Sequence, residues 1–356
     1  MAPDTRFRAL TVEKEHLMKK TRTRSAEQDQ RLSRRALLGG AAATGAAASM
    51  LPLLNAQPPQ GGQPAAGAQP AGRGGRGPTP GGTGPIKVLF ITKFHPFDRE
   101  NLFLTLDSMG KDITWTHVEH PAATAFFDPK LAAQFDVFLF YDALTGRVQK
   151  QNPDGTSTTD YTEPPADAKA NLKQLLRNGD KGFVFFHHAI AAWVHTWPEY
   201  VEVMGAAADW GTPLKNIRGK DYPPSGFRGG VQQHITVVDK NHPVTQGVSD
   251  FDIVDETYLC PMFEDSVHPL LRTDYKTVFE SDWSNKARIT GHPPGSNMTG
   301  WVKTAERSPV VYIQHGHDKL AWDNPAFRTL MLNAIKWTAS KDGKDWAHAN
   351  AKKIFA

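Results

Sequence analysis

The run Gly182-Phe183-Val184-Phe185-Phe186-His187-His188-Ala189 joins an uncharged apolar segment directly to a pair of histidines. A short apolar segment of this kind predicts a strand that is buried on both faces of a sheet. The histidine pair then falls at the sharp turn that follows such a strand, where other α/β enzymes place a nucleophile. An imidazole there can act as a base, an acid or a metal ligand, because its pKa of ~6.5 lies close to neutrality.

The alternation of apolar runs with amphipathic stretches continues on both sides of this segment. Apolar runs predict further strands, and apolar residues at helical spacing predict helices between them. We therefore expect an α/β domain of three layers, with a mostly parallel sheet between two layers of helices. The region 210–263 is richer in turns and predicts loops and shorter strands inserted at the rim. The predicted strands cover 86–92, 136–142, 182–186 and 309–314, and the predicted helices cover 98–109, 165–177 and 325–340.

Polar residues that directly follow these strands are candidates for a site, because ligands of such folds lie beyond the carboxyl ends of the strands. A twisted parallel sheet would bring two of them, His188 and His317, close together. The candidates at this rim are His95, Asp142, His187, His188, His315 and His317.

Several common chemistries are excluded by what stands at the strand ends. Thr92-Lys93-Phe94-His95-Pro96 follows the first strand in place of a phosphate-binding glycine loop, which disfavours a nucleotide cofactor. The sequence has no Gly-x-Ser-x-Gly elbow, and its one cysteine, Cys260, lies away from the strand ends. A serine or cysteine triad, an internal disulfide and a sulfur-only metal site are therefore excluded.

Motifs spread along residues 86–340 resemble the ThuA-like family, which is named for trehalose utilisation and is similar in fold to class I glutamine amidotransferases and flavodoxins. The resemblance therefore implies a flavodoxin-like α/β/α sheet. They include the initial strand, the histidine elbow, His-Pro-Val-Thr, Asp-Glu-Thr-Tyr, Gln-His-Gly-His and a closing Trp-Asp-Asn-Pro-Ala-Phe. Amidotransferases of this fold use a Cys–His–Glu triad. Here the family's elbow position is matched to His188 rather than to a cysteine, so the resemblance does not extend to glutamine hydrolysis. The motifs lie at 87–92, 182–189, 242–247, 255–258, 311–318 and 322–327.

The resemblance and the rim together assign a candidate site. We expect catalytic roles for His188, His317 and Glu256, with Glu256 preferred over its neighbour Asp255. His188 and His317 are also candidate ligands of a divalent metal, zinc or a similar ion, since mixed imidazole and carboxylate sets suit such metals. Tryptophans after the elbow would stack on a sugar. The candidate substrate-binding residues are His95, Asp142, His187, Trp193, Tyr258 and His315.

The first 56 residues predict a twin-arginine signal peptide. Arg34-Arg35 stands directly before an apolar, alanine-rich run, and small residues near Ala56 offer a cleavage site. The run is close to the ~18–20 residues of a membrane span, so a retained anchor is the alternative. We therefore expect an exported, periplasmic protein whose partner during transport is the twin-arginine machinery.

Residues 57–85 contain ten glycines and seven prolines and predict a flexible linker, while residues 341–356 are expected as a C-terminal tail. Charge follows this division. Residues 1–85 hold twelve of the 41 Lys and Arg and five of the 37 Asp and Glu, which leaves 29 basic and 32 acidic residues in 86–356. The high isoelectric point thus belongs to the targeting segment, and no nucleic-acid partner is expected.

Two functions follow from the resemblance. The first is a sugar-processing enzyme that acts on a trehalose-like molecule, a keto-sugar or a glycoside through histidine and carboxylate groups or a bound metal. The second is a non-catalytic carbohydrate-binding module of the cell envelope. The two differ in whether the histidines or only the tryptophans are needed.

Overall fold

The computed structural model describes residues 79–93, 95–275, 283–285 and 291–355. The predicted signal segment and residues 57–78 of the predicted linker lie outside the described residues. In the part that is described, no helix combines the length and the apolar character that a membrane span requires.

Five neighbouring strands form the parallel half of a nine-stranded sheet, in the order β2-β1-β3-β6-β13. Four of them are the predicted apolar runs, and β3 and β6 are buried along their whole length. Both faces of β3 and β6 are covered, which explains why polar residues do not alternate with apolar ones along these two strands. The α/β fold predicted from these runs is confirmed. The five strands are β1 (Ile86–Lys93), β2 (Ile113–Glu119), β3 (Val137–Asp142), β6 (Gly182–Phe186) and β13 (Ser308–Ile313).

The other four strands continue the sheet in antiparallel order from β13, as β12-β11-β9-β10. Loops and short strands were expected in this part of the chain, whereas β9 and β10 are long members of the main sheet. In β9, alternate residues from Val231 to Val237 are buried, so half of the strand is polar and was not recognised as sheet. The strands are β9 (Gly226–Val237), β10 (Phe251–Leu259), β11 (His268–Thr273) and β12 (Met298–Ala305).

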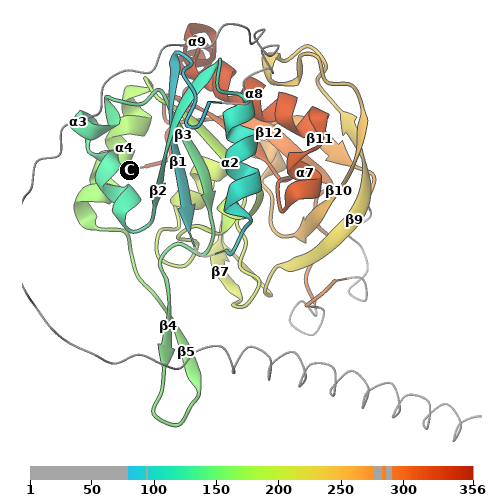
Figure 1. Cartoon of the computed structure of the whole chain (residues 1–356). Coiled ribbons are helices and arrows are strands. Elements are labelled where there is room, and N and C mark those ends of the chain that lie inside the picture. The colour runs from blue at the N-terminus through green and yellow to red at the C-terminus, as the bar shows by residue number, and fades with distance from the viewer. Residues whose placement is uncertain (1–78, 94, 276–282, 286–290, 356) are drawn as a thin grey trace, which may run out of the picture. The chain divides into compact units, whose positions relative to one another are not determined.

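Helices cover the two faces of the sheet and bury two separate cores (Figure 1). Consecutive residues of β1 belong to opposite cores: Val88 and Phe90 face one, and Leu89 and Ile91 face the other. The first core is closed by α2 (Arg99–Ser108), α7 (Lys319–Trp322) and α8 (Pro325–Ala339). The second is closed by η1 (Ala122–Phe127), α3 (Pro129–Ala132), α4 (Ala166–Asn178) and α5 (Tyr200–Met204).

The smaller elements lie outside this framework. The hairpin of β4 (Arg147–Gln151) and β5 (Ser157–Tyr161) extends away from the sheet in Figure 1. A second two-stranded sheet pairs β7 (Leu214–Ile217) with β8 (Lys220–Tyr222). Three further 3-10 turns are η2 (His187–Ala191), η3 (Pro243–Thr245) and η4 (Glu264–Ser266).

Both ends of the domain reach beyond the boundaries expected from the sequence. The end of the predicted linker is attached to the sheet, because the Gly81 amide donates to Asp107 Oδ1 at 2.8 Å and Gly82 forms a bridge with Thr114. The expected C-terminal tail instead forms α9 (Lys341–Ala349), since the hydroxyl of Ser340 caps a new helix directly after α8. Its last residues return to the core, where Phe355 is fully buried.

Candidate functional site

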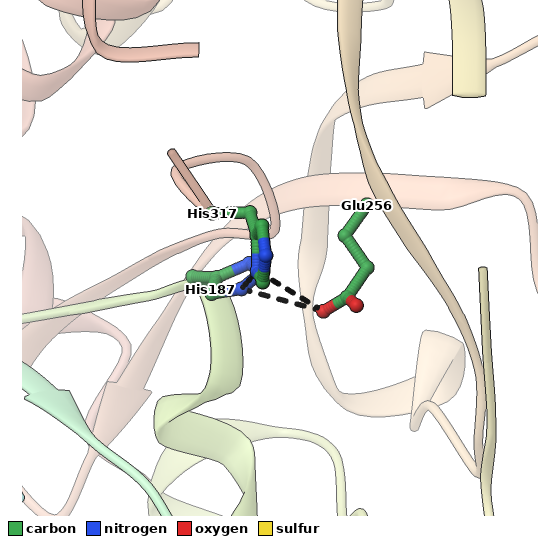
Figure 2. Close-up of side chains that lie close together, drawn as sticks. All are labelled: His187, Glu256 and His317. Atoms are coloured by element: carbon green, nitrogen blue, oxygen red, sulfur yellow. Dashed lines mark hydrogen bonds and ion pairs between the residues drawn. The ribbon is translucent and has the colours of Figure 1, made fainter. Parts of the chain in front are cut away.

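Three polar side chains from different parts of the chain meet beyond the carboxyl ends of β6 and β13. His187 follows β6, His317 follows β13, and Glu256 lies on β10. One ligand atom of each lies within 4.8 Å of the others. Figure 2 shows the two imidazoles side by side, with the carboxylate of Glu256 reaching toward both from the opposite strand.

His187 occupies the strained elbow after β6. Its φ of 54° lies in the left-handed region, which a non-glycine residue rarely adopts and which often marks a functional site. The backbone carbonyl of His187 accepts a hydrogen bond of 2.8 Å from the Tyr312 hydroxyl, which helps to hold this turn. From the sequence, His188 was expected at the elbow, but the strand ends at Phe186, so His187, the first residue of the pair, makes the turn.

The tautomer of His187 follows from its backbone contact. Its Nδ1 lies 3.1 Å from the carbonyl oxygen of Gln314, and a carbonyl can only accept, so Nδ1 carries the hydrogen. The lone pair of Nε2 is then directed at His317 Nδ1, 3.0 Å away, and at the Tyr258 hydroxyl, 2.9 Å away. Burial, reinforced by the neighbouring His188 and His317, lowers the pKa of His187 well below its usual value. The ring is therefore neutral near pH 7 and presents one unprotonated nitrogen to the site.

Glu256 reaches the histidines because β9 and β10 are out of register there. Asp255 pairs with Val231 and Thr257 with Arg228, so two glycines of β9, Gly229 and Gly230, stand opposite Glu256 alone. Such a bulge bends the strands and redirects a side chain. Glu256 Oε2 lies 3.5 Å from both His187 Nε2 and His317 Nδ1. Burial raises the pKa of Glu256, and the opposing charge of His317 limits that rise.

The neighbouring carboxylate, Asp255, has a positioning role. It is buried, and it accepts hydrogen bonds from the amides of Gly316 at 2.7 Å, Glu256 at 2.8 Å and His317 at 3.2 Å. These contacts tie the loop after β13 to β10. The loop also needs Gly316 itself, whose φ is 127° and where an added Cβ would come within 2.9 Å of the Phe186 ring. Asp255 thus fixes the backbone that carries His317.

A pocket of about 210 Å³ opens next to this cluster. Its walls are largely apolar, and its polar groups come from Glu256, the Tyr258 hydroxyl and two imidazoles. The rings of His95 and His188 lie 4.9 Å apart, and His95 lies 5.2 Å from His317. Burial, followed by the charge of His317, lowers the pKa of His95. The lining residues are His95, Leu144, His188, Trp210, Phe227, Glu256 and Tyr258.

His188 forms a wall of the pocket rather than facing His317. Its ring is almost fully buried and packs 4.2 Å from that of Tyr141. Burial, with the nearby His95 and His317, lowers the pKa of His188 well below its usual value. It is therefore a neutral group next to the cluster, and the structure brings His187, rather than the predicted His188, together with His317 and Glu256.

Three of the residues expected to bind substrate are buried away from the pocket lining. Asp142 accepts a 2.7 Å hydrogen bond from Thr145 Oγ1, and His315 faces Asp255 with Nδ1 3.4 Å from Oδ2. Trp193 is 3% exposed and packs on Tyr200, with ring centroids 5.2 Å apart. The tryptophan at the pocket is Trp210, which packs on Tyr258.

The His-Pro-Val-Thr motif has a structural role. His242 Nδ1 accepts a hydrogen bond of 3.2 Å from the Val244 amide and so caps η3. Burial lowers the pKa of His242 to about 4, which keeps the ring neutral and able to accept. The motif is joined to α8 by Asn333, whose side-chain amide donates to the carbonyl of Val244 at 3.2 Å.

The sequence over residues 87–338 matches the ThuA family, described as trehalose utilisation. The chain belongs to the ThuA family. A comparison with curated proteins gives no match. This ThuA protein is similar in fold to a solved ThuA-like protein from Parabacteroides merdae, with 17% sequence identity and a TM-score of 0.51 over 72% of this chain and 90% of that chain.

Two other solved structures give lower scores. A ThuA-like protein from Bacteroides uniformis is 17% identical, with a TM-score of 0.47 over 73% of this chain and 93% of that chain. A glutamine amidotransferase from Thermotoga maritima is 10% identical, with a TM-score of 0.35 over 72% of this chain and 99% of that chain.

Proposed function

We propose that this ThuA protein is an enzyme that processes a trehalose-like molecule, a keto-sugar or a glycoside at the pocket beside His187, Glu256 and His317. The observation that carries the proposal is the convergence of these three groups on one point at the edge of an aromatic pocket. Family membership supports the sugar class of the substrate.

The pocket suits one ring of a sugar. Its volume of about 210 Å³ is below the roughly 300–1,000 Å³ of pockets that take drug-sized ligands, so a disaccharide would place a single ring inside. Trp210 and Phe227 offer apolar surfaces on which the C–H face of a sugar ring can pack.

The polar cluster supplies the chemistry. His187 presents an unprotonated Nε2 that can accept a proton, and burial raises the pKa of Glu256, which makes this carboxyl group a better proton acceptor than an exposed one. His317 is the most exposed of the three side chains, at 29%. His95 and Tyr258, which also line the pocket, would orient the sugar.

The proposal is tested by incubating the purified protein with trehalose, simple glucosides and their keto derivatives, and following the products by mass spectrometry. We expect His317→Ala to lower turnover at least a hundredfold, because its ring is part of the cluster. The matched control is His234→Ala, which removes an exposed histidine that pairs with Asp252. Sugar binding without turnover in the parent protein, unchanged in His317→Ala, would instead establish a non-catalytic binding module.

We also propose that the protein acts outside the cytoplasm after twin-arginine export. The support is Arg34-Arg35 before the apolar run of the N-terminal segment. Expression of the full chain in a bacterial host, followed by cell fractionation, should place it in the periplasm. The pair of substitutions Arg34→Lys and Arg35→Lys should retain it in the cytoplasm. Recovery of the parent chain in the cytoplasm, or export of the double variant at the parent level, would contradict twin-arginine transport.

A further inference from the structure

We infer that His187, Glu256 and His317 bind one divalent transition-metal ion of the zinc class, with a coordination position left open toward the pocket. This inference deepens the proposed function, since it concerns the same three side chains. It rests on the distances between the three ligand atoms, on the contacts that orient them and on the pocket beside them.

The distances match one face of a tetrahedral site. Two ligand atoms that are each about 2.0–2.1 Å from a tetrahedral zinc lie about 3.3 Å from each other. Here His187 Nε2 and His317 Nδ1 are 3.0 Å apart, and each is 3.5 Å from Glu256 Oε2. The three distances are nearly equal, so a single ion beside the triangle can contact all three atoms.

Hydrogen bonds to the two histidines do not account for the position of Glu256 in this triangle. A distance of 3.5 Å from carboxylate oxygen to imidazole nitrogen exceeds the usual 2.7–3.2 Å, so Glu256 is close to both rings without a strong bond to either. The Glu256 side chain is only 12% exposed, and a buried carboxylate needs a compensating positive charge. A divalent ion would provide that charge.

The surroundings have the features of a second coordination shell. Metal-binding histidines commonly donate their other ring N–H to a backbone carbonyl, as His187 does to Gln314. The Tyr258 hydroxyl is hydrogen-bonded to Glu256 and lies 2.9 Å from His187 Nε2, and Asp255 fixes the backbone of His317. The ligands are thereby oriented before an ion arrives, which lowers the cost of binding.

Two histidines and one carboxylate are also the ligand number and type of catalytic sites. Structural zinc sites have four protein ligands, whereas catalytic sites have three and leave the fourth position to water or substrate. No other group of three such residues in the described part of the chain comes together in this way. Glu256 is shared between the cluster and the pocket lining, so the open position lies where a sugar oxygen would enter.

The test measures metal binding on the untagged full chain, without any sugar. After treatment with a chelator, titration calorimetry with Zn²⁺ should show one equivalent bound. Co²⁺ should give the visible absorption bands of a four-coordinate site. We expect His317→Ala and Glu256→Gln each to weaken Zn²⁺ binding at least a hundredfold, and the control His234→Ala to bind as the parent does.

Failure of the parent to bind Zn²⁺ or Co²⁺, or equal binding by both site variants, would overturn the metal site. The proposed function is judged separately by turnover. If the parent binds neither ion and still processes sugar, the metal site is wrong and the enzyme stands. If the metal binds at the three residues and no sugar is turned over, the metal site stands and the enzyme proposal fails.

Discussion

Glu256→Gln is expected to lower sugar turnover at least a hundredfold while the melting temperature stays the same or rises. The substitution keeps the shape of the side chain and removes its charge. Glu256 is mostly buried, and burial raises its pKa. Keeping this carboxylate ionised in the folded protein therefore lowers the free energy of unfolding. A neutral amide removes that cost but can neither exchange a proton nor neutralise a metal ion. Gain of stability together with loss of activity is typical of a functional carboxylate.

Steady-state kinetics and thermal unfolding of the same preparations check this prediction. The matched control is Glu199→Gln, an exposed glutamate before α5 that makes no side-chain capping bond, and it should change neither quantity. If Glu256→Gln retained the parent rate, Glu256 would have no chemical role. If it lost activity only together with a large drop in melting temperature, the residue would be structural.

The parallel half of the fold could be predicted from the sequence because strands buried on both faces are continuous apolar runs. β9 and β10 escaped prediction for the opposite reason. One face of β9 is exposed, so Gln232, His234 and Thr236 interrupt its apolar residues. The Gly229-Gly230 pair, which creates the bulge opposite Glu256, also resembled a turn. The local pattern gave no sign that these glycines lie inside a strand.

The site could be predicted only in part, for reasons of register and long-range packing. Sequence patterns locate the end of a strand to within a residue or two, and that uncertainty separates His187 from His188. Similarly, Trp193 is six residues from the elbow but points into the core, whereas Trp210 packs on Tyr258 from β10. The sequence favoured Glu256 over Asp255, and Glu256 is the one whose carboxylate lies beside the two histidines. Only the hydrogen bonds from the surrounding amides show that Asp255 holds the backbone, while Glu256 faces the histidines.

Asp255→Ala is expected to lower both stability and activity, because it leaves three amides without their acceptor. The amides belong to Glu256, Gly316 and His317, and the first two lie within 2.8 Å of the carboxylate. Removing the acceptor of buried amides costs about 1–3 kcal/mol for each that stays unsatisfied, so the free energy of unfolding should fall by about 2–4 kcal/mol. The loop that carries His317 would then move, and a shift of about 1 Å at a catalytic group can cost a hundredfold in rate.

The control separates the loss of stability from the loss of position. Asp107 is another buried carboxylate, and it accepts hydrogen bonds from the Gly81 amide at 2.8 Å and from Trp115 Nε1 at 3.0 Å, at a place remote in the sheet from the cluster. Asp107→Ala should therefore lose stability as Asp255→Ala does, yet keep the parent turnover well below its melting temperature. Equal activity of the two variants under folded conditions would show that Asp255 stabilises the fold without positioning His317. A rate loss confined to Asp255→Ala would show that the loop between β13 and α7 must be held to β10 for the site to work.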